Sequence, residues 1–137
     1  MQGEIENIAG KKLVAKKTIL LVDDDEDEHE IFLSALKTLN KDYNFISAGN
    51  CDQALFILKE FDPDYIFIDV NMPKVNGMVC LEEIKKISRL ADVPVYMYST
   101  GINEKEGQKA LKLGALDYVV KPNNISSLST LLTKILK

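Results

Sequence analysis

A chain of 137 residues is long enough for one domain with a packed core and too short for two domains of ordinary size. Its composition, 46% hydrophobic and 28% charged, is typical of a globular protein, and no apolar run approaches the roughly 18 residues that a membrane span requires. The formal net charge of −4 argues against general nucleic-acid binding, which needs a basic face for phosphates. We therefore expect neither a membrane nor a nucleic acid as a partner.

The charge is divided unevenly along the chain. Residues 1–17 carry four lysines against two glutamates, whereas the rest carries 13 basic and 19 acidic residues, so the first segment is basic and the body is acidic. We expect residues 1–17 to be a flexible N-terminal leader and residues 18–137 to form one folded domain. The leader lacks the continuous apolar stretch of a secretory signal, which predicts a cytoplasmic protein.

Short apolar runs alternate five times with segments of helical periodicity after residue 17. Start and stop signals bound the helices, such as Asn50 with Gln53 at one start and Gly114 at one end. A loop is expected over residues 70–77, because Pro73 and Gly77 interrupt regular structure. In chain order, the predicted elements are strand 18–22, helix 26–40, strand 43–48, helix 50–61, strand 65–69, a helix through residues 80–87, strand 93–99, helix 103–114, strand 117–120 and helix 125–136.

This alternation determines the predicted fold class. Strands that alternate with helices of about 10–15 residues are typical of right-handed crossovers and of a parallel sheet covered on both faces. We therefore predict an α/β fold, a doubly wound (βα)5 unit of the flavodoxin-like type with five parallel strands in the order 2-1-3-4-5. In that order the third strand lies centrally, between the first and the fourth.

Polar residues stand at the ends of four predicted strands. Because the carboxyl ends of parallel strands share one edge, where open α/β sheets bind ligands, we expect their side chains to meet. Carboxylates, a hydroxyl and an ammonium are the groups needed to move a phosphoryl group onto an aspartate. These residues are Asp23 and Asp24 after the first strand, Asp69 at the third, Ser99 at the fourth and Lys121 after the fifth.

Each of these residues has an expected role. Asp69 is the nucleophile, and Mg²⁺, which prefers hard oxygen ligands, would offset the negative charge of the phosphoryl donor. Lys121 can pair with Asp69 and then with a transferred phosphoryl oxygen, to which Ser99 can donate a hydrogen bond. The expected metal ligands are Asp24 and Asp69 directly, Asp23 through a water, and the backbone carbonyl of Asn71.

Four motifs carry a resemblance to a known family. They are LLVDDD at residues 20–25, FIDVNMPKVNG at 67–77, YMYST at 96–100 and DYVVKP at 117–122. Together, in this order, they resemble the receiver domains of bacterial two-component response regulators, over essentially all of residues 18–137. The resemblance is to a stand-alone receiver, like those of chemotaxis. Two positions depart from the usual pattern: Ser99 replaces the commoner threonine, and Asn123 stands where an aromatic residue is frequent.

The resemblance implies a function. Asp69 would be phosphorylated reversibly by a histidine kinase or phosphotransfer protein, with Mg²⁺ at Asp23, Asp24 and Asp69. Ser99 and Tyr118 would form the switch, Ser99 moving toward the phosphoryl group and Tyr118 turning inward behind it. A cis Lys121–Pro122 bond and a structural role for Gly77 are also implied. The protein would not be an enzyme beyond promoting its own phosphorylation and dephosphorylation.

The output would be a change of surface on helix 103–114, strand 117–120 and helix 125–136, read by a downstream protein. Passing the phosphoryl group on in a phosphorelay, and homodimerisation, stay open. One alternative is a scaffold with this fold that is never phosphorylated. A remote alternative is a small Mg²⁺-dependent phosphatase of the haloacid-dehalogenase type, which needs a second acid two residues after its nucleophile, where this chain has Asn71.

Several residues receive plainer interpretations. Cys51 and Cys80 lie inside helical patterns without metal-ligand spacing, so we predict two buried, reduced thiols. His29 is expected to be solvated, and so are the remaining acids of the run 23–30, namely Asp25, Asp27, Glu28 and Glu30. Gly107 in a helix interior costs roughly 1 kcal/mol relative to alanine. It reflects either simple tolerance of a weak helix or a helix kept mobile for signalling.

Overall fold

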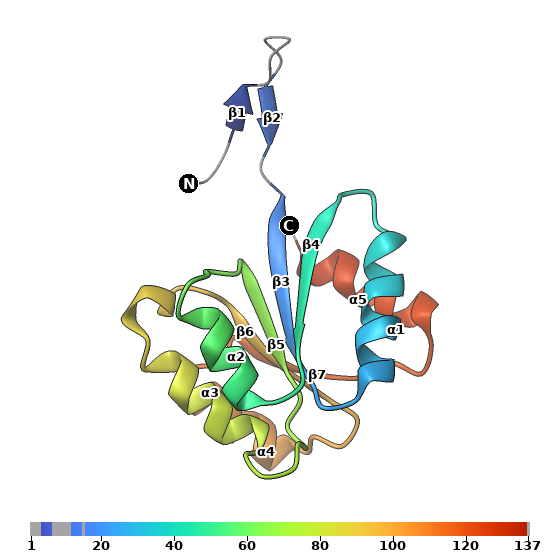
Figure 1. Ribbon diagram of the computed structural model, residues 1–137. Helices are drawn as coiled ribbons and strands as arrows, with labels where there is room; N and C mark the ends of the chain where they lie inside the picture. The colour runs from blue at the N-terminus through green and yellow to red at the C-terminus, as the bar shows by residue number, and fades with distance from the viewer. Residues whose placement is uncertain (1–3, 7–11, 15, 137) are drawn as a thin grey trace.

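The computed structural model describes residues 4–6, 12–14 and 16–136 (Figure 1). Within them, a sheet of five parallel strands has the order β4-β3-β5-β6-β7. This is the predicted order 2-1-3-4-5, so the doubly wound fold class is confirmed. The strands are β3 (Lys17–Val22), β4 (Tyr43–Ala48), β5 (Tyr65–Ile68), β6 (Val95–Ser99) and β7 (Asp117–Val120).

Helices cover both faces of this sheet (Figure 1). One apolar cluster joins α1 and α5 to one face, and the other joins α2, α3 and α4 to the opposite face. The helices are α1 (Glu26–Lys37), α2 (Cys51–Leu58), α3 (Gly77–Lys85), α4 (Glu104–Lys112) and α5 (Ile125–Ile135), with a short 3-10 turn, η1, at Ser88–Leu90. None of the helices in the described part of the chain is long and apolar enough to cross a membrane.

Burial explains why the central strands read as unbroken apolar runs. Every residue of β5 and β6 is buried, and so is all of β3 after Lys17, because helices cover both of their faces. The edge strands β4 and β7 are only partly buried. The buried central strands therefore fix the positions of the polar residues at their carboxyl ends.

Each α-helix starts at a side chain that accepts a backbone hydrogen bond from the first turn. Such caps contribute about 1 kcal/mol each and fix where a helix begins. The predicted capping box at Asn50 is only half formed: Asn50 accepts from the Gln53 N–H, but the Gln53 side chain accepts from Gly49. Gly114 has the left-handed φ of 111° expected after a helix end. The capping residues are Asp25, Asn50, Asn76, Asn103 and Asn124.

Two short strands lie in the region predicted as a leader. β1 (Glu4–Glu6) pairs antiparallel with β2 (Lys12–Val14), and the pair stands beyond the start of β3 (Figure 1). β3 itself starts at Lys17, one residue before the predicted boundary. Flexibility of residues 1–17 stays a prediction.

The two cysteines form a disulfide, so the prediction of reduced thiols is wrong. Cys51 at the start of α2 is bonded to Cys80 in α3, with 5.6 Å between their Cα atoms. Both side chains are buried, as expected. The sequence separation of 29 residues did not reveal the pairing, because it depends on α2 and α3 lying side by side on one face of the sheet.

Candidate functional site

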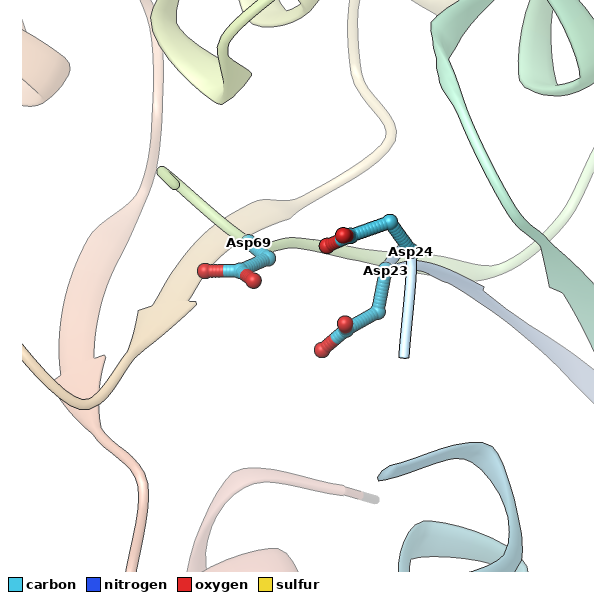
Figure 2. A group of neighbouring side chains, drawn as sticks. All are labelled: Asp23, Asp24 and Asp69. Atoms are coloured by element: carbon cyan, nitrogen blue, oxygen red, sulfur yellow. The ribbon is translucent and has the colours of Figure 1, made fainter. Parts of the chain in front are cut away.

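Three carboxylates gather at the carboxyl edge of the sheet (Figure 2). Asp23 and Asp24 follow β3, Asp69 follows β5, and one oxygen from each lies within 4.8 Å of the other two. Asp23 and Asp69 are buried, at 0% and 7% exposure, whereas Asp24 is open to solvent. The predicted meeting of these side chains is therefore present, with one face of the group accessible.

Backbone hydrogen bonds hold the two buried acids in register. The Asp69 N–H donates to the carbonyl of Val22, and the Asp23 N–H donates to the carbonyl of Ala48. These bonds continue the parallel ladders just past the strand ends, so the acids inherit the rigidity of the sheet. The Asp25 N–H in turn donates to Oδ1 of Asp23 at 3.0 Å, which fixes that carboxylate at the entry to α1.

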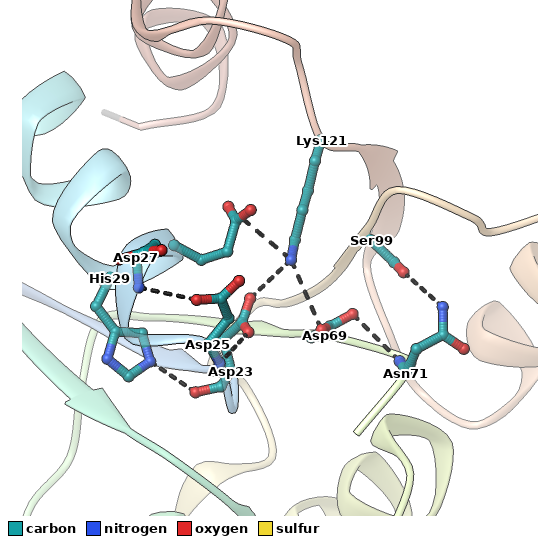
Figure 3. Close-up of polar contacts among 9 residues, drawn as sticks. Asp23, Asp25, Asp27, His29, Asp69, Asn71, Ser99 and Lys121 are labelled. Atoms are coloured by element: carbon teal, nitrogen blue, oxygen red, sulfur yellow. Dashed lines mark hydrogen bonds and ion pairs between the residues drawn. The ribbon is translucent and has the colours of Figure 1, made fainter. Parts of the chain in front are cut away.

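Lys121 supplies the cation of the site (Figure 3). Its Nζ lies 2.7 Å from Oδ2 of Asp23, 3.6 Å from Oδ2 of Asp69 and 4.0 Å from Oε1 of Glu28. Burial lowers the pKa of Lys121, but the hydrogen bond to Asp23 and the surrounding carboxylates outweigh burial, so its pKa is raised. The lysine is charged, and its single positive charge is shared between the two buried aspartates.

Two carboxyl groups near Lys121 hold protons more tightly than usual. Burial raises the pKa of Asp69 above its ordinary value, and the charge of Lys121 and the hydrogen bond from the Asn71 N–H offset this only in part. Burial likewise raises the pKa of Glu28, with Asp23, Asp25 and Asp69 adding repulsion. One lysine is too little positive charge for this group, and such a donor set fits a hard divalent cation.

Asn71 connects Asp69 to Ser99. Its backbone N–H donates to Oδ1 of Asp69 at 3.2 Å, and its side-chain Nδ2 donates to the Ser99 hydroxyl at 3.2 Å (Figure 3). Ser99 is buried at the end of β6. The sequence predicts a role only for the backbone carbonyl of Asn71, and not for its side-chain amide. That carbonyl as a metal ligand stays a prediction.

Two residues assigned to solvent belong to the site. Glu28 lies within ion-pair distance of Lys121, and His29 donates from Nε2 to the carbonyl of Asp23 at 2.6 Å. Both stand in the first turns of α1, and only three residues separate the end of β3 from the start of this helix. Side chains in a helix tilt toward its N-terminus, so a helix that starts this close to the sheet edge presents some of its first side chains to that edge. The short spacing between strand and helix could have predicted this.

The loop after Asp69 depends on Gly77. A Cβ placed on Gly77 would overlap the carbonyl oxygen of Asp69, so only glycine allows α3 to begin this close to the site. The Gly77 N–H donates to the carbonyl of Val70 at 2.8 Å, which closes the loop.

The remaining predicted site residues lie on β7 or just after it. Tyr118 is half-buried on β7 and contacts α4 rather than the carboxylates. The Lys121–Pro122 bond is trans, like every peptide bond in the described residues, so the expected cis bond is corrected. The trans form of an X-Pro bond is favoured by only about 0.5–1 kcal/mol, and sequence alone therefore leaves both forms open.

The family model described as "Response regulator receiver domain" matches residues 19–133. The chain belongs to the response regulator receiver family. As a receiver domain, it is part of a family of two-component signalling proteins.

Solved receiver structures have the same fold. The chemotaxis protein CheY4 of Vibrio cholerae has a TM-score of 0.79 at 26% identity, over 89% of this chain and 100% of that chain. The phosphorylated cyanobacterial phytochrome response regulator RcpA has a TM-score of 0.80 at 29% identity, over 88% and 91%. The Mn(2+)-bound form of response regulator Rcp1 has a TM-score of 0.75 at 28% identity, over 87% and 91%.

Curated relatives are longer than this receiver domain. The probable transcriptional regulator ycf27 of Porphyridium aerugineum is 32% identical over 122 residues, which are 89% of this chain and 49% of that protein. The sensor histidine kinase CheAY of Helicobacter pylori is 25% identical over 139 residues, covering 100% of this chain and 17% of that protein. The chain thus spans about half the length, or less, of these relatives.

Proposed function

We propose that this receiver domain accepts a phosphoryl group on Asp69, from a histidine kinase or a phosphotransfer protein. The observation that carries the proposal is the placement of Asp69, whose carboxylate meets those of Asp23 and Asp24 and lies 3.6 Å from Nζ of Lys121. In the transfer, an Asp69 oxygen forms a bond to phosphorus while the bond from phosphorus to the donor breaks. The donor keeps the electron pair of that bond.

The carboxylates support a role for Mg²⁺. Asp24 and Asp69 would bind the ion directly and Asp23 through a water, with the Asn71 carbonyl as a further ligand. A bound cation supplies positive charge that offsets the donor oxygens as they approach Asp69. The three carboxylates fit such an ion, since they gather within 4.8 Å and their negative charge exceeds that of Lys121. The Mn²⁺-bound form of Rcp1 shows that a relative holds a divalent cation.

Lys121 and Ser99 have complementary parts in this proposal. Lys121 already lies 3.6 Å from Asp69 and can follow the negative charge onto a phosphoryl oxygen. The Ser99 hydroxyl accepts from Asn71, and its own hydrogen bond toward Asp69 offsets part of the rise that burial causes in the pKa of that carboxyl. The same hydroxyl proton could be donated to a phosphoryl group on Asp69. The Lys121 ammonium and the Ser99 hydroxyl are held in position before a donor arrives. Preorganised groups of this kind stabilise the charge that develops in a transition state.

The output would be a change of surface on α4, β7 and α5, with Ser99 and Tyr118 as the switch. Apolar side chains already stand exposed there, at Leu111, Leu116, Val120 and Ile125. A downstream protein would read this surface, or the phosphoryl group would pass on to another protein in a relay. Our proposal places the protein in the cytoplasm and leaves homodimerisation open.

The phosphatase alternative loses support from Asn71. An amide cannot act as a general acid, and its Nδ2 is engaged with Ser99. Incubation with acetyl phosphate, followed by intact-mass measurement, tests the proposal. We expect a single phosphoryl adduct with Mg²⁺ and none in excess EDTA or in the Asp69→Asn variant. No adduct with any donor would favour the phosphorylation-independent scaffold, and turnover of a simple phosphomonoester would favour the phosphatase.

A further inference from the structure

Gly107 stands in the interior of α4, where glycine is unfavourable. Relative to alanine, glycine at such a position lowers the folding equilibrium constant about fivefold. The backbone there is regular, since the Gly107 N–H donates to the carbonyl of Asn103 at 2.9 Å, as in any α-helix. Neither a turn nor a left-handed φ therefore requires this glycine, and its contacts have to explain it.

The contact is with the ring of Tyr118. A Cβ placed on Gly107 would overlap three atoms of that ring, so the ring occupies the space that any other side chain would fill. Only two residues of α4 are buried, and they are the small ones, Gly107 and Ala110. The helix thus lies close to β7, with the tyrosine ring packed against its backbone.

We propose that Gly107 is a positioning residue that forms the seat of the Tyr118 ring and couples the position of the ring to that of α4. The inference rests on the proposed function, in which Tyr118 is a switch residue. A ring that leaves the seat opens a void, and the neighbouring element shifts to fill part of it, because voids in packed protein are unfavourable. Movement of Tyr118 and displacement of α4 therefore occur together, which carries the change to the exposed side chains of Leu111 and Val120.

The seat is tested first by a double-mutant cycle in urea unfolding, with Gly107→Ala, Tyr118→Ala and both together. With the ring removed, Gly107→Ala is an ordinary helix substitution and raises the folding constant about fivefold. With Tyr118 present, we expect the same substitution to be at least about fivefold less favourable, because ring and methyl compete for one space. Gly101→Ala, in the loop before α4, is a control for a glycine away from the Tyr118 ring, since its Cβ would meet only Nδ2 of Asn71, at 3.8 Å. Its effect should be the same with and without Tyr118.

If Gly107→Ala changes stability equally with Tyr118 present and with Tyr118 replaced by alanine, the proposal that Gly107 seats the ring is overturned. If Gly107→Ala alone fails to fold, folding of the double variant supports the seat and its failure to fold overturns it. None of these outcomes depends on phosphorylation, so the cycle remains decisive even if the proposed function is wrong.

The coupling is tested by hydrogen exchange over residues 103–113, before and after treatment with acetyl phosphate and Mg²⁺. In the wild type, we expect phosphorylation to change the exchange of these amides. In Gly107→Ala, we expect equal phosphoryl incorporation by mass and no such change, because the ring no longer occupies its seat. A response equal to that of the wild type would overturn the coupling, whereas a wild type that takes up no phosphoryl group would count against the proposed function alone.

Discussion

Nζ of Lys121 lies 2.7 Å from Oδ2 of Asp23 but 3.6 Å from Oδ2 of Asp69. The cation is therefore anchored on the acid that precedes α1, and Asp69 keeps the weaker ion pair. This arrangement leaves the proposed nucleophile within reach of Lys121 without a tight ion pair that would have to break before transfer. It also means that we expect Lys121 to stabilise the fold, in addition to its proposed part in phosphoryl transfer.

Replacing Lys121 with methionine is expected to destabilise the protein. Removing one partner of a buried ion pair leaves an uncompensated charge, which costs about 3–5 kcal/mol, and Asp23 is 0% exposed. Urea unfolding measures this loss. Lys112→Met is the matched control because Lys112 is exposed on α4, and an equal effect of the two substitutions would contradict the ion-pair account.

The raised pKa of Asp69 predicts a pH dependence. The folded state binds this proton more tightly than the unfolded state, since the pKa lies above the ordinary 3.8. The stability that this group contributes is full below that value and is lost as the pH rises through the folded-state pKa. Without added metal, we therefore expect the wild type to lose stability relative to Asp69→Asn as the pH rises from acid toward neutral. A difference that does not vary with pH would show that burial leaves this carboxyl unperturbed.

Magnesium is expected to stabilise the folded state. A ligand that binds only the folded protein adds about 2.7 kcal/mol when its concentration is 100 times Kd. Thermal unfolding across a Mg²⁺ series should therefore show a rising Tm for the wild type and a much smaller rise for Asp24→Asn. Glu30→Gln, an exposed acid on α1, should respond like the wild type. Equal responses in all three proteins would mean that magnesium acts on general charge rather than at this site.

The Cys51–Cys80 disulfide predicts a dependence on reductant. Closing a loop of 29 residues stabilises a protein by about 3–4 kcal/mol in the chain-entropy model. Thiol titration of the unfolded, unreduced protein should find no free thiol, and a dithiol reductant should release two and lower stability. A Cys51→Ala, Cys80→Ala variant should not respond to reductant. Two free thiols before reduction would show that the cysteines are unpaired in solution. Reducing compartments keep thiols reduced, so in a cytoplasm the stability of the protein would be that of its reduced form.

The parts of the fold that follow from chain periodicity were predictable. Alternating strands and helices specify a parallel sheet, and the sheet brings Asp23, Asp24 and Asp69 to one edge whatever the details of packing. Helix ends were less predictable: α1 ends at Lys37 and α2 at Leu58, each three residues before the prediction. The apolar pattern continues past the end of α1, because Leu39 still packs against the core.

Contacts between distant elements were not predictable. The disulfide depends on how α2 and α3 lie together, and the place of Glu28 depends on the angle at which α1 leaves β3. Gly107 was read as a weakness of α4 in isolation, whereas its environment is set by Tyr118 on another element. A sequence pattern predicts which side of a helix or strand is buried, but it does not predict which residue of another element packs against it.

The central claim is that Asp69 is the phosphoryl acceptor. Borohydride reduces an aspartyl phosphate to homoserine, so peptide mass spectrometry after acetyl phosphate and Mg²⁺ treatment can locate the modified residue. The account predicts homoserine at position 69 and an unmodified peptide covering residues 23–30. Homoserine at Asp23 or Asp24, or at no position, would contradict it.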